Sequence, residues 1–296
     1  MTKVLNIGSL NIDYVYSVQH LVQPGETIIC KEYHQFCGGK GLNQSIALVL
    51  AGAETFHAGK IGSEGSFLKE RLKAVGVNTD YIETVPDEAT GHTIIQVDEN
   101  GQNSITLYGG ANQKFSKEDV AKILVAFSAG DYLLLQNEVN QIPEMIQQAR
   151  QKDMIVIYNP APINDSVFTY PLQDIDYFVI NETEGMGLTG KTEPDEIIAE
   201  MRRKFPRAAA ILTLGENGVI FADSAQTVKM PAEKVVPVDT TAAGDTFIGF
   251  FIAQKLKGNT VENCLRTATR AAAICVTRRG AADSIPLKEE VVYDEY

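Results

Sequence analysis

The sequence predicts an α/β protein with three layers, α/β/α, in which helices cover both faces of a mostly parallel sheet. Along most of the chain, short runs rich in β-branched residues alternate with longer runs that have the apolar spacing of helices. The length of 296 residues is enough for one large α/β core. Strands are expected at 4–7, 55–58, 132–135, 155–158, 177–180 and 210–214, and helices at 42–50, 66–74, 116–126, 143–151 and 194–204.

Two segments interrupt this alternation and predict a small accessory sheet. Residues 91–108 have the pattern of a β-hairpin with Asn100-Gly101 in its turn, and residues 11–36 are also extended, with a break at Pro24-Gly25. Such hairpins could pair with each other as a lid over a ligand cleft, or lie at an edge of the main sheet. The first alternative gives an α/β body at 1–10, 37–90 and 109–296 and a β-lid at 11–36 and 91–108.

The overall charge limits the partners of the protein. A net charge of −12 and a pI near 4.9 argue against nucleic acid or an anionic membrane. An anionic small molecule is not excluded, because backbone N–H groups can hold a phosphate in an acidic protein. The first residues lack the pattern of a secretory signal, no apolar run approaches the roughly 18 residues that span a bilayer, and the four cysteines include no C-x-x-C pair. We therefore expect a cytoplasmic protein.

Residues 238–247, Val-Asp-Thr-Thr-Ala-Ala-Gly-Asp-Thr-Phe, carry the clearest chemical motif. Asp245 opens an apolar helix here, and the free N–H groups and positive dipole end of a helix start form an anion site. Ala242, Ala243 and Gly244 are small enough to let a phosphate approach. Asp245 could take the proton from an attacking hydroxyl while the N–H groups stabilise the transferring group. The local sequence is equally compatible with Asp245 as a simple helix cap.

Three weaker motifs lie where predicted strands end or helices begin. Residues 37–44, Cys-Gly-Gly-Lys-Gly-Leu-Asn-Gln, combine glycines that admit a ligand with two polar groups, although a loop with positive φ would need the same glycines. Residues 181–184, Asn-Glu-Thr-Glu, suit Mg²⁺ bound through waters, or form an ordinary acidic helix start. Residues 213–218, Thr-Leu-Gly-Glu-Asn-Gly, could line a nucleotide, but the local sequence favours a hairpin turn.

Residues 185–192 match the P-loop pattern G-x-x-x-x-G-K-[ST] letter for letter. In a P-loop the glycines follow the strand directly, and the Lys opens the next helix. Here residues 181–184 separate the strand from the glycines, and Pro194 indicates a later helix start. We predict instead that Gly190 ends a short helix begun near Thr183, and that the match is not a P-loop.

Taken together, the motifs resemble those of the ribokinase-like (PfkB) carbohydrate kinase family. In chain order, the matching segments are 11–13, 38–43, 159–162 (Asn-Pro-Ala-Pro), 181–184, 213–215, 239–245 and 271–280. They span nearly the whole chain, and the 239–245 signature is highly specific. Leu42 departs from the family pattern, which has Ala there, and is expected to add bulk near the sugar.

The resemblance implies a three-layer body with a small β-lid that often serves as the dimer contact, so a homodimer through the lid is expected. It also implies phosphoryl transfer from ATP·Mg²⁺ to a sugar hydroxyl, with K⁺ as an activator. D-ribose, converted to ribose 5-phosphate, is the expected acceptor; deoxyribose, fructose or a nucleoside is the alternative. A non-catalytic sugar-binding regulator is a more distant alternative, which the intact Asp245 motif disfavours.

The resemblance assigns roles by position. Asp245 would be the base, and the anion hole would be formed by Ala242, Ala243 and Gly244. The sugar would meet Asn11, Asp13, Gly39, Lys40, Asn43 and Glu138. ATP would lie near Asn181, Glu184, Thr213, Gly215, Gly218 and Thr269. The monovalent cation would be held, mostly through backbone oxygens, by Asp239, Thr241, Cys275, Arg278, Gly280 and Ser284.

Overall fold

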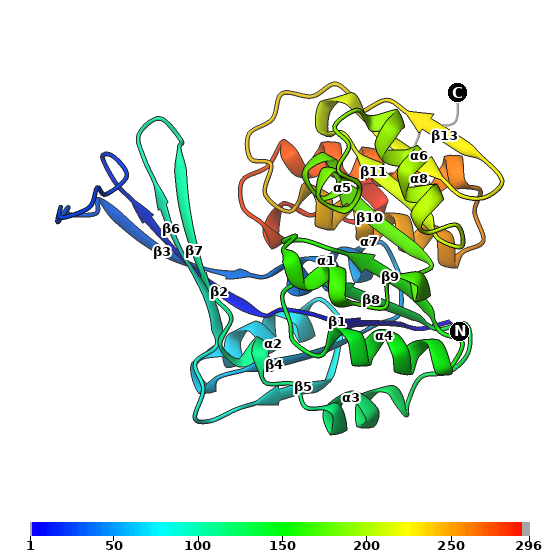
Figure 1. Cartoon of the computed structure of the whole chain (residues 1–296). Coiled ribbons are helices and arrows are strands. Elements are labelled where there is room, and N and C mark those ends of the chain that lie inside the picture. The colour runs from blue at the N-terminus through cyan, green and yellow to red at the C-terminus, as the bar shows by residue number, and fades with distance from the viewer. Residues whose placement is uncertain (1, 292–296) are drawn as a thin grey trace.

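The computed structural model describes residues 2–291, which form a nine-stranded sheet and a separate four-stranded sheet (Figure 1). In spatial order the strands of the larger sheet are β13 (Thr227–Met230), β12 (Val219–Ala222), β11 (Ala209–Thr213), β10 (Tyr177–Asn181), β9 (Ile155–Asn159), β8 (Tyr132–Gln136), β1 (Val4–Ile7), β4 (Thr55–Ile61) and β5 (Asn78–Thr84). From β11 to β5 in this order all neighbours are parallel, whereas β12 pairs antiparallel with β11 and β13 pairs antiparallel with β12. The expected mostly parallel sheet is confirmed.

Helices cover both faces of the larger sheet and create two apolar cores. Alternate residues of a strand point to opposite faces, so Val4 lies in one core and Leu5 in the other. One layer consists of α1 (Lys40–Leu50), α2 (Ser66–Ala74), α7 (Ala243–Leu256) and α8 (Val261–Val276). The other consists of α3 (Lys117–Leu124), α4 (Ile142–Gln151), α5 (Glu182–Thr189) and α6 (Pro194–Lys204). Among residues 2–291, no helix has both the length and the apolar character needed to cross a membrane.

The segment that matches the P-loop pattern forms a helix and its end. Helix α5 begins at Glu182, directly after β10, and finishes at Gly190, whose φ of 72° lies in the left-handed region that glycine adopts most easily. Helix α6 starts later, with Pro194 in its first turn. The prediction that this match is not a P-loop is therefore confirmed.

The smaller sheet extends away from the body in Figure 1. Its strands, in spatial order, are β3 (Glu32–Gly38), β2 (Asn11–Ser17), β6 (Gly91–Val97) and β7 (Asn103–Tyr108). Strand β2 pairs antiparallel with β3 and parallel with β6, and β6 and β7 form the expected hairpin. The alternative that these strands edge the main sheet is therefore wrong. Strand β3 continues to Gly38, beyond the expected lid limit at residue 36.

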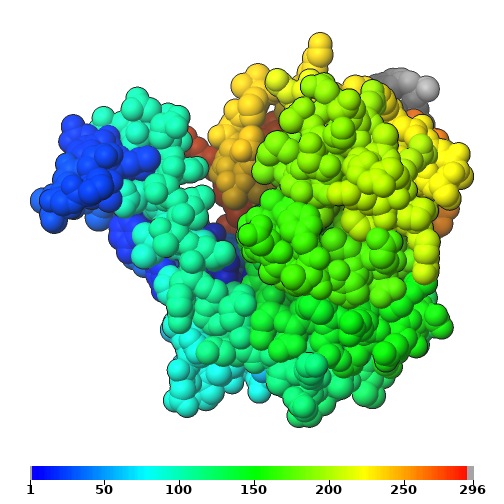
Figure 2. Space-filling view, viewed as in Figure 1, coloured from blue at the N-terminus to red at the C-terminus, as the bar shows by residue number. Residues whose placement is uncertain are grey.

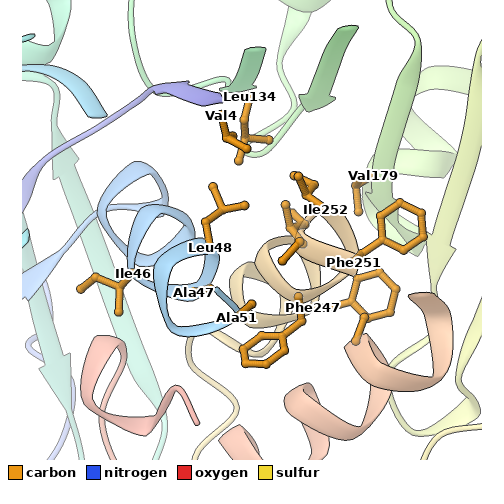
Figure 3. Packing of buried hydrophobic residues seen from close by; sticks show 14 of the residues in the cluster. Val4, Ile46, Ala47, Leu48, Ala51, Leu134, Val179, Phe247, Phe251 and Ile252 are labelled. Carbon is orange, nitrogen blue, oxygen red and sulfur yellow. The ribbon is translucent and has the colours of Figure 1, made fainter. Parts of the chain in front are cut away.

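Helices α1 and α7 cross at unusually short range. A Cβ on Gly249 of α7 would lie 2.7 Å from the carbonyl carbon of Ala47 in α1, closer than van der Waals contact allows. Figure 3 shows the two helices side by side beneath the strands, with Leu48 of α1 and Ile252 of α7 in the apolar cluster between them and the sheet. Small residues at the crossing thus let the two helix backbones approach each other.

Replacing Gly249 with Val should force α1 and α7 apart and lower the free energy of unfolding by about 1–3 kcal/mol, because the added methyl groups meet the backbone of Ala47. Urea unfolding measures this change. Lys122→Val in α3 is the matched control: Lys122 is exposed, so only the helix-propensity cost of a β-branched residue, about 0.5 kcal/mol, should appear. Equal losses in the two variants would contradict the tight crossing.

Candidate active site

The first turn of α7 places Asp245 beside an open backbone turn. Ala242 precedes the helix with a φ of 61°, a left-handed conformation that is unfavourable for a residue with a Cβ and that is found mainly at functional sites. A Cβ on Gly244 would meet nothing within 4 Å, so the space in front of this turn is free. The N–H groups of a first helical turn have no partner within the helix. Together these features form a site for an anion.

The carboxylate of Asp245 is bound by two amides of α1. Asn43 Nδ2 donates to Oδ2 at 3.1 Å, and Gln44 Nε2 donates to Oδ1 at 2.8 Å. No side chain caps α7, so Asp245 does not serve as its cap. Asp245 is only 9% exposed, yet both of its carboxylate oxygens accept hydrogen bonds from these amides.

Lys40, at the start of α1, carries the positive charge at the centre of the site. Burial disfavours its ammonium group, but attraction to Asp245, Glu138, Glu184 and Asp13 outweighs burial and raises its pKa. The same burial raises the pKa of Glu138 and of Glu184, with Lys40 acting in the opposite direction. Four carboxylates from separate segments therefore surround one lysine, which remains charged at neutral pH.

The residues expected to bind the sugar have fixed partners close to this lysine. Oε2 of Glu138 accepts from the Lys40 N–H at 3.2 Å and from the Ser9 hydroxyl. Asn11 Oδ1 accepts from Asn112 Nδ2 at 2.7 Å. Burial raises the pKa of Asp13, whose Oδ1 accepts from the Thr93 hydroxyl of β6.

Gly39 completes this group as the residue before α1. Its φ of 96° is left-handed, and a Cβ there would lie 2.9 Å from the carbonyl oxygen of Ser9, so a side chain does not fit. Figure 2 shows the molecule hollowed between the smaller sheet and the body.

Two cavities meet at the start of α7 and share Thr213, Thr240, Ala243 and Gly244. The smaller, about 240 Å³, is lined by residues that include Lys40, Asn181, Glu184, Ala242 and Asp245. The larger, about 810 Å³, includes Gly215, Gly218 and Thr269 in its lining. The residues expected near ATP therefore line two connected spaces.

The segments around both cavities have ordinary local structure. Residues 215–217 form a short turn between β11 and β12, as the local sequence favours. Asn181 and Glu184 form a capping box at the start of α5, in which each side chain accepts a hydrogen bond from the other's backbone N–H.

The residues expected to hold a cation lie behind the turn at Ala242. Asp239 accepts from the Thr241 N–H at 2.9 Å and from the Gly280 N–H at 3.0 Å. Burial alone would raise the pKa of Asp239, but hydrogen bonds from Thr241 and Gly280 outweigh it and lower the pKa. The Cys275 thiol contacts both the Thr241 carbonyl oxygen and the Ser284 hydroxyl, at 3.7 and 3.0 Å.

Arg278 is different from the rest of this group. Its guanidinium is turned to the surface and pairs with Glu290, so only its backbone belongs to this region.

Several polar residues of the site were missed in the sequence. Gln44 directly follows the last residue assigned in its motif, and Asn159 belongs to the Asn-Pro-Ala-Pro segment, which received no role. Asn112 and Ser9 show no local signal, because the Asn11 and Glu138 side chains that they contact lie more than 100 residues away along the chain. Leu42 is fully buried in the core under α1, so the expectation that its bulk lies near the sugar is wrong.

Residues 1–288 match the family described as pfkB family carbohydrate kinase. Ribokinase of Staphylococcus aureus (strain COL) is 36% identical over 300 residues, which cover 98% of each chain. The solved ribokinase of Cryptococcus neoformans var. grubii serotype A in complex with ADP has a TM-score of 0.87 at 32% identity, covering 98% of this chain and 99% of that one. The Arabidopsis thaliana ribokinase complexed with ribose and ATP also has a TM-score of 0.87, at 30% identity and 98% coverage of both chains. The chain therefore belongs to the pfkB family of carbohydrate kinases.

Proposed function

We propose that the protein transfers the γ-phosphoryl group of ATP to D-ribose, giving ribose 5-phosphate, with Asp245 as the base. The observation that carries this proposal is the position of the Asp245 carboxylate, which lines the smaller cavity beside the open turn of α7 where the two cavities meet. The similarity to ribokinases, one of them solved with ribose and ATP, supports the choice of substrates.

In the proposed reaction, the sugar hydroxyl gives its proton to Asp245 as its oxygen forms a bond to the γ-phosphorus. The bond from that phosphorus to the bridging oxygen breaks, and ADP leaves with the electron pair. The N–H groups of Ala243 and Gly244, of which the first also contacts the Thr240 carbonyl oxygen at 3.3 Å, stabilise the negative charge of the transferring group, and Lys40 adds a positive charge. The rest of the sugar is held by the amides and carboxylates of Asn11, Asp13, Asn43 and Glu138, together with Gly39.

We place the nucleotide base and ribose of ATP in the larger cavity, beside Thr213, Gly215, Gly218 and Thr269. Its phosphates then reach the smaller cavity, which Asn181 and Glu184 line. Mg²⁺ would neutralise phosphate charge there. Within the described residues, no three side chains of His, Cys, Asp or Glu gather as metal ligands, which fits an ion held chiefly by phosphates and water.

Asp245→Asn should reduce kcat by about 10²–10⁴-fold, since the amide has nearly the same shape but cannot accept the hydroxyl proton. ATP binding, measured by calorimetry, should remain close to that of the unmodified enzyme. Asp195→Asn is the control, because Asp195 is also in the first turn of a helix but is exposed and pairs with Lys229. Turnover by Asp245→Asn at the rate of the control would remove Asp245 as the base.

A panel of acceptors tests the substrate. ADP release should be fastest with D-ribose and slower with deoxyribose, which lacks one hydroxyl for the polar groups around Lys40. Fructose and nucleosides belong in the same panel, and NMR of the product should show phosphate on the primary hydroxyl of ribose. Failure to phosphorylate any pentose would refute the ribose assignment, and failure with every acceptor would favour a non-catalytic regulator.

We also propose an activating K⁺ site at 239–241 and 275–284. Backbone carbonyl oxygens and one carboxylate suit K⁺, and Asp239 and Ser284 offer side-chain oxygens in the same region. Such a cation would fix the turn that contains Ala242.

Turnover should rise severalfold when Na⁺ is replaced by K⁺ at constant ionic strength. Asp239→Asn should weaken this response because it removes a negative charge near the ion. Asp223→Asn, in the turn between β12 and β13 where the carboxylate accepts from the Ala225 and Gln226 N–H groups, should leave the response intact. Equal rates in Na⁺ and K⁺ would eliminate the site.

The homodimer and the cytoplasmic location stay predictions. We propose that two copies pair through the smaller sheet, because it exposes large apolar side chains that a free sheet would leave in water, among them Tyr33, Phe36, Ile94, Ile105, Leu107 and Tyr108. A lid function for this sheet is consistent with Asn11 and Asp13, which belong to β2.

A further inference from the structure

Beneath Asp245 lies a continuous chain of buried amides that links the base to the strands of the larger sheet. Gln44 Nε2 donates to Asp245, and Gln44 Oε1 accepts from Gln136 Nε2 at 2.7 Å. Gln136 Nε2 also donates to Asn6 Oδ1 at 2.9 Å. The side chains of Gln44, Gln136 and Asn6 are all 0% exposed. Every bond in this chain therefore forms away from bulk water and depends on its protein partners.

The direction of these bonds is fixed at one end by a backbone carbonyl. Asn6 Nδ2 donates to the Gly41 carbonyl oxygen at 2.8 Å, and a carbonyl can only accept. Asn6 must therefore turn its side-chain oxygen toward Gln136, and the amino group of Gln136 donates to that oxygen. That amino group in turn requires the oxygen of Gln44, which leaves the amino group of Gln44 for Asp245.

A second carbonyl imposes the same direction from another strand. Asn159 Nδ2 donates to the Val179 carbonyl oxygen at 2.9 Å, so Asn159 Oδ1 is available as an acceptor. Gln44 Nε2 lies 3.3 Å from this oxygen and donates to it as well as to Asp245. Two independent anchors thus agree on how Gln44 is oriented.

The remote end of the chain adds no charge. Asn6 Nδ2 also donates to the Ser45 hydroxyl at 2.8 Å, which contacts His57 Nδ1 at 2.8 Å. Burial lowers the pKa of His57 to about 3, so this imidazole stays neutral across the working pH range. Among the side chains named in this connected set, Asp245 carries the only carboxyl group.

We propose that Gln44 and Gln136 are positioning residues for Asp245. The Gly41 and Val179 carbonyls fix which end of each amide donates, and this keeps the amino group of Gln44 directed at the Asp245 carboxylate. This inference rests on the proposed role of Asp245 as the base. It goes further in assigning the orientation of that carboxylate to two glutamines, of which Gln44 contacts the carboxylate and Gln136 acts through Gln44. The inference also predicts that reversing the donor and acceptor ends of Gln44 lowers kcat more than removing one hydrogen bond of the chain.

Exchanges at Gln136 separate polarity from packing. Gln136→Glu keeps the size but removes the donor, so Gln44 must turn its amino group toward the new carboxylate and its oxygen toward Asp245. We expect kcat to fall about 10–100-fold, with KM for sugar and ATP changed less than about threefold. Gln136→Met removes the donor without adding an acceptor, and Asn159 still orients Gln44, so kcat should fall less than about fivefold.

Exchanges at Gln44 test the bond to the base directly. Gln44→Glu places a second carboxylate within hydrogen-bond distance of Asp245, and two like charges at that distance hold a proton between them. The acid limb of the kcat–pH profile should therefore move upward by about one unit or more. Gln44→Met should lower kcat about tenfold and move this limb less.

The other ionisable groups that face Asp245 are Lys40 from α1, Glu138 after β8, Glu184 from α5 and Cys275 from α8. All four are unchanged in these variants.

The control is Asn140→Asp, a half-buried amide whose side chain exchanges two hydrogen bonds with the backbone of Phe115. It should lower the melting temperature but leave the kcat–pH profile in place. Melting curves show whether each variant is folded. If Gln44→Glu is not folded, the comparison of kcat for Gln136→Glu and Gln136→Met still tests the inference. Equal kcat for Gln136→Glu and Gln136→Met overturns the inference, as does an unmoved acid limb in Gln44→Glu. If Asp245→Asn loses activity but none of the Gln44 and Gln136 variants does, this inference is wrong and the proposed function stands.

Discussion

Helices α1 and α7 come from opposite ends of the chain, and the crossing of Ala47 with Gly249 lets their backbones approach until one helix start faces the other. The distance between them determines whether Asn43 and Gln44 can reach the carboxylate of Asp245 at about 3 Å. A hydrogen bond to a charged group weakens steeply with distance, so a shift of one ångström between the helices would break these bonds. The open turn of α7, the proposed base Asp245 and its donors therefore all depend on close apolar packing that lies one to two turns away.

The strands under α1 change from apolar to polar side chains toward their carboxyl ends. On the face that α1 covers, Val4 is followed by Asn6, Leu134 by Gln136 and Ile157 by Asn159, each pair two residues apart. The first member of each pair packs in the core, and the second joins the hydrogen bonds around Gln44. One face of the sheet thus changes from apolar to polar where the parallel strands end, which is where ligands bind in folds of this class.

Much of the body was predictable from the sequence, since apolar periodicity located six strands and five helices. Helix α8 was not predicted as a helix, although Thr260 caps its start and its alanine-rich run favours helix. The role of Asp245 was undecided from local sequence because a cap and a base use the same residue type at the same place. Its bonds to Asn43 and Gln44, about 200 residues away, show that it is not a helix cap, and its role as the base is our proposal. The amide chain could not be predicted for the same reason: its polarity depends on four strands, β1, β8, β9 and β10, and on helix α1 at once.

The groups proposed to hold the sugar belong to two bodies joined by few covalent connections. Asn11 and Asp13 are part of β2 and therefore of the smaller sheet, whereas Asn43, Glu138 and Asp245 belong to the α/β body. A small tilt of the sheet would move the first pair relative to the acceptor without altering the bonds that orient the base. Selectivity among sugars and the rate of phosphoryl transfer can therefore diverge independently, because substitutions in the sheet reshape one half of the sugar site while the chemistry remains anchored in the body.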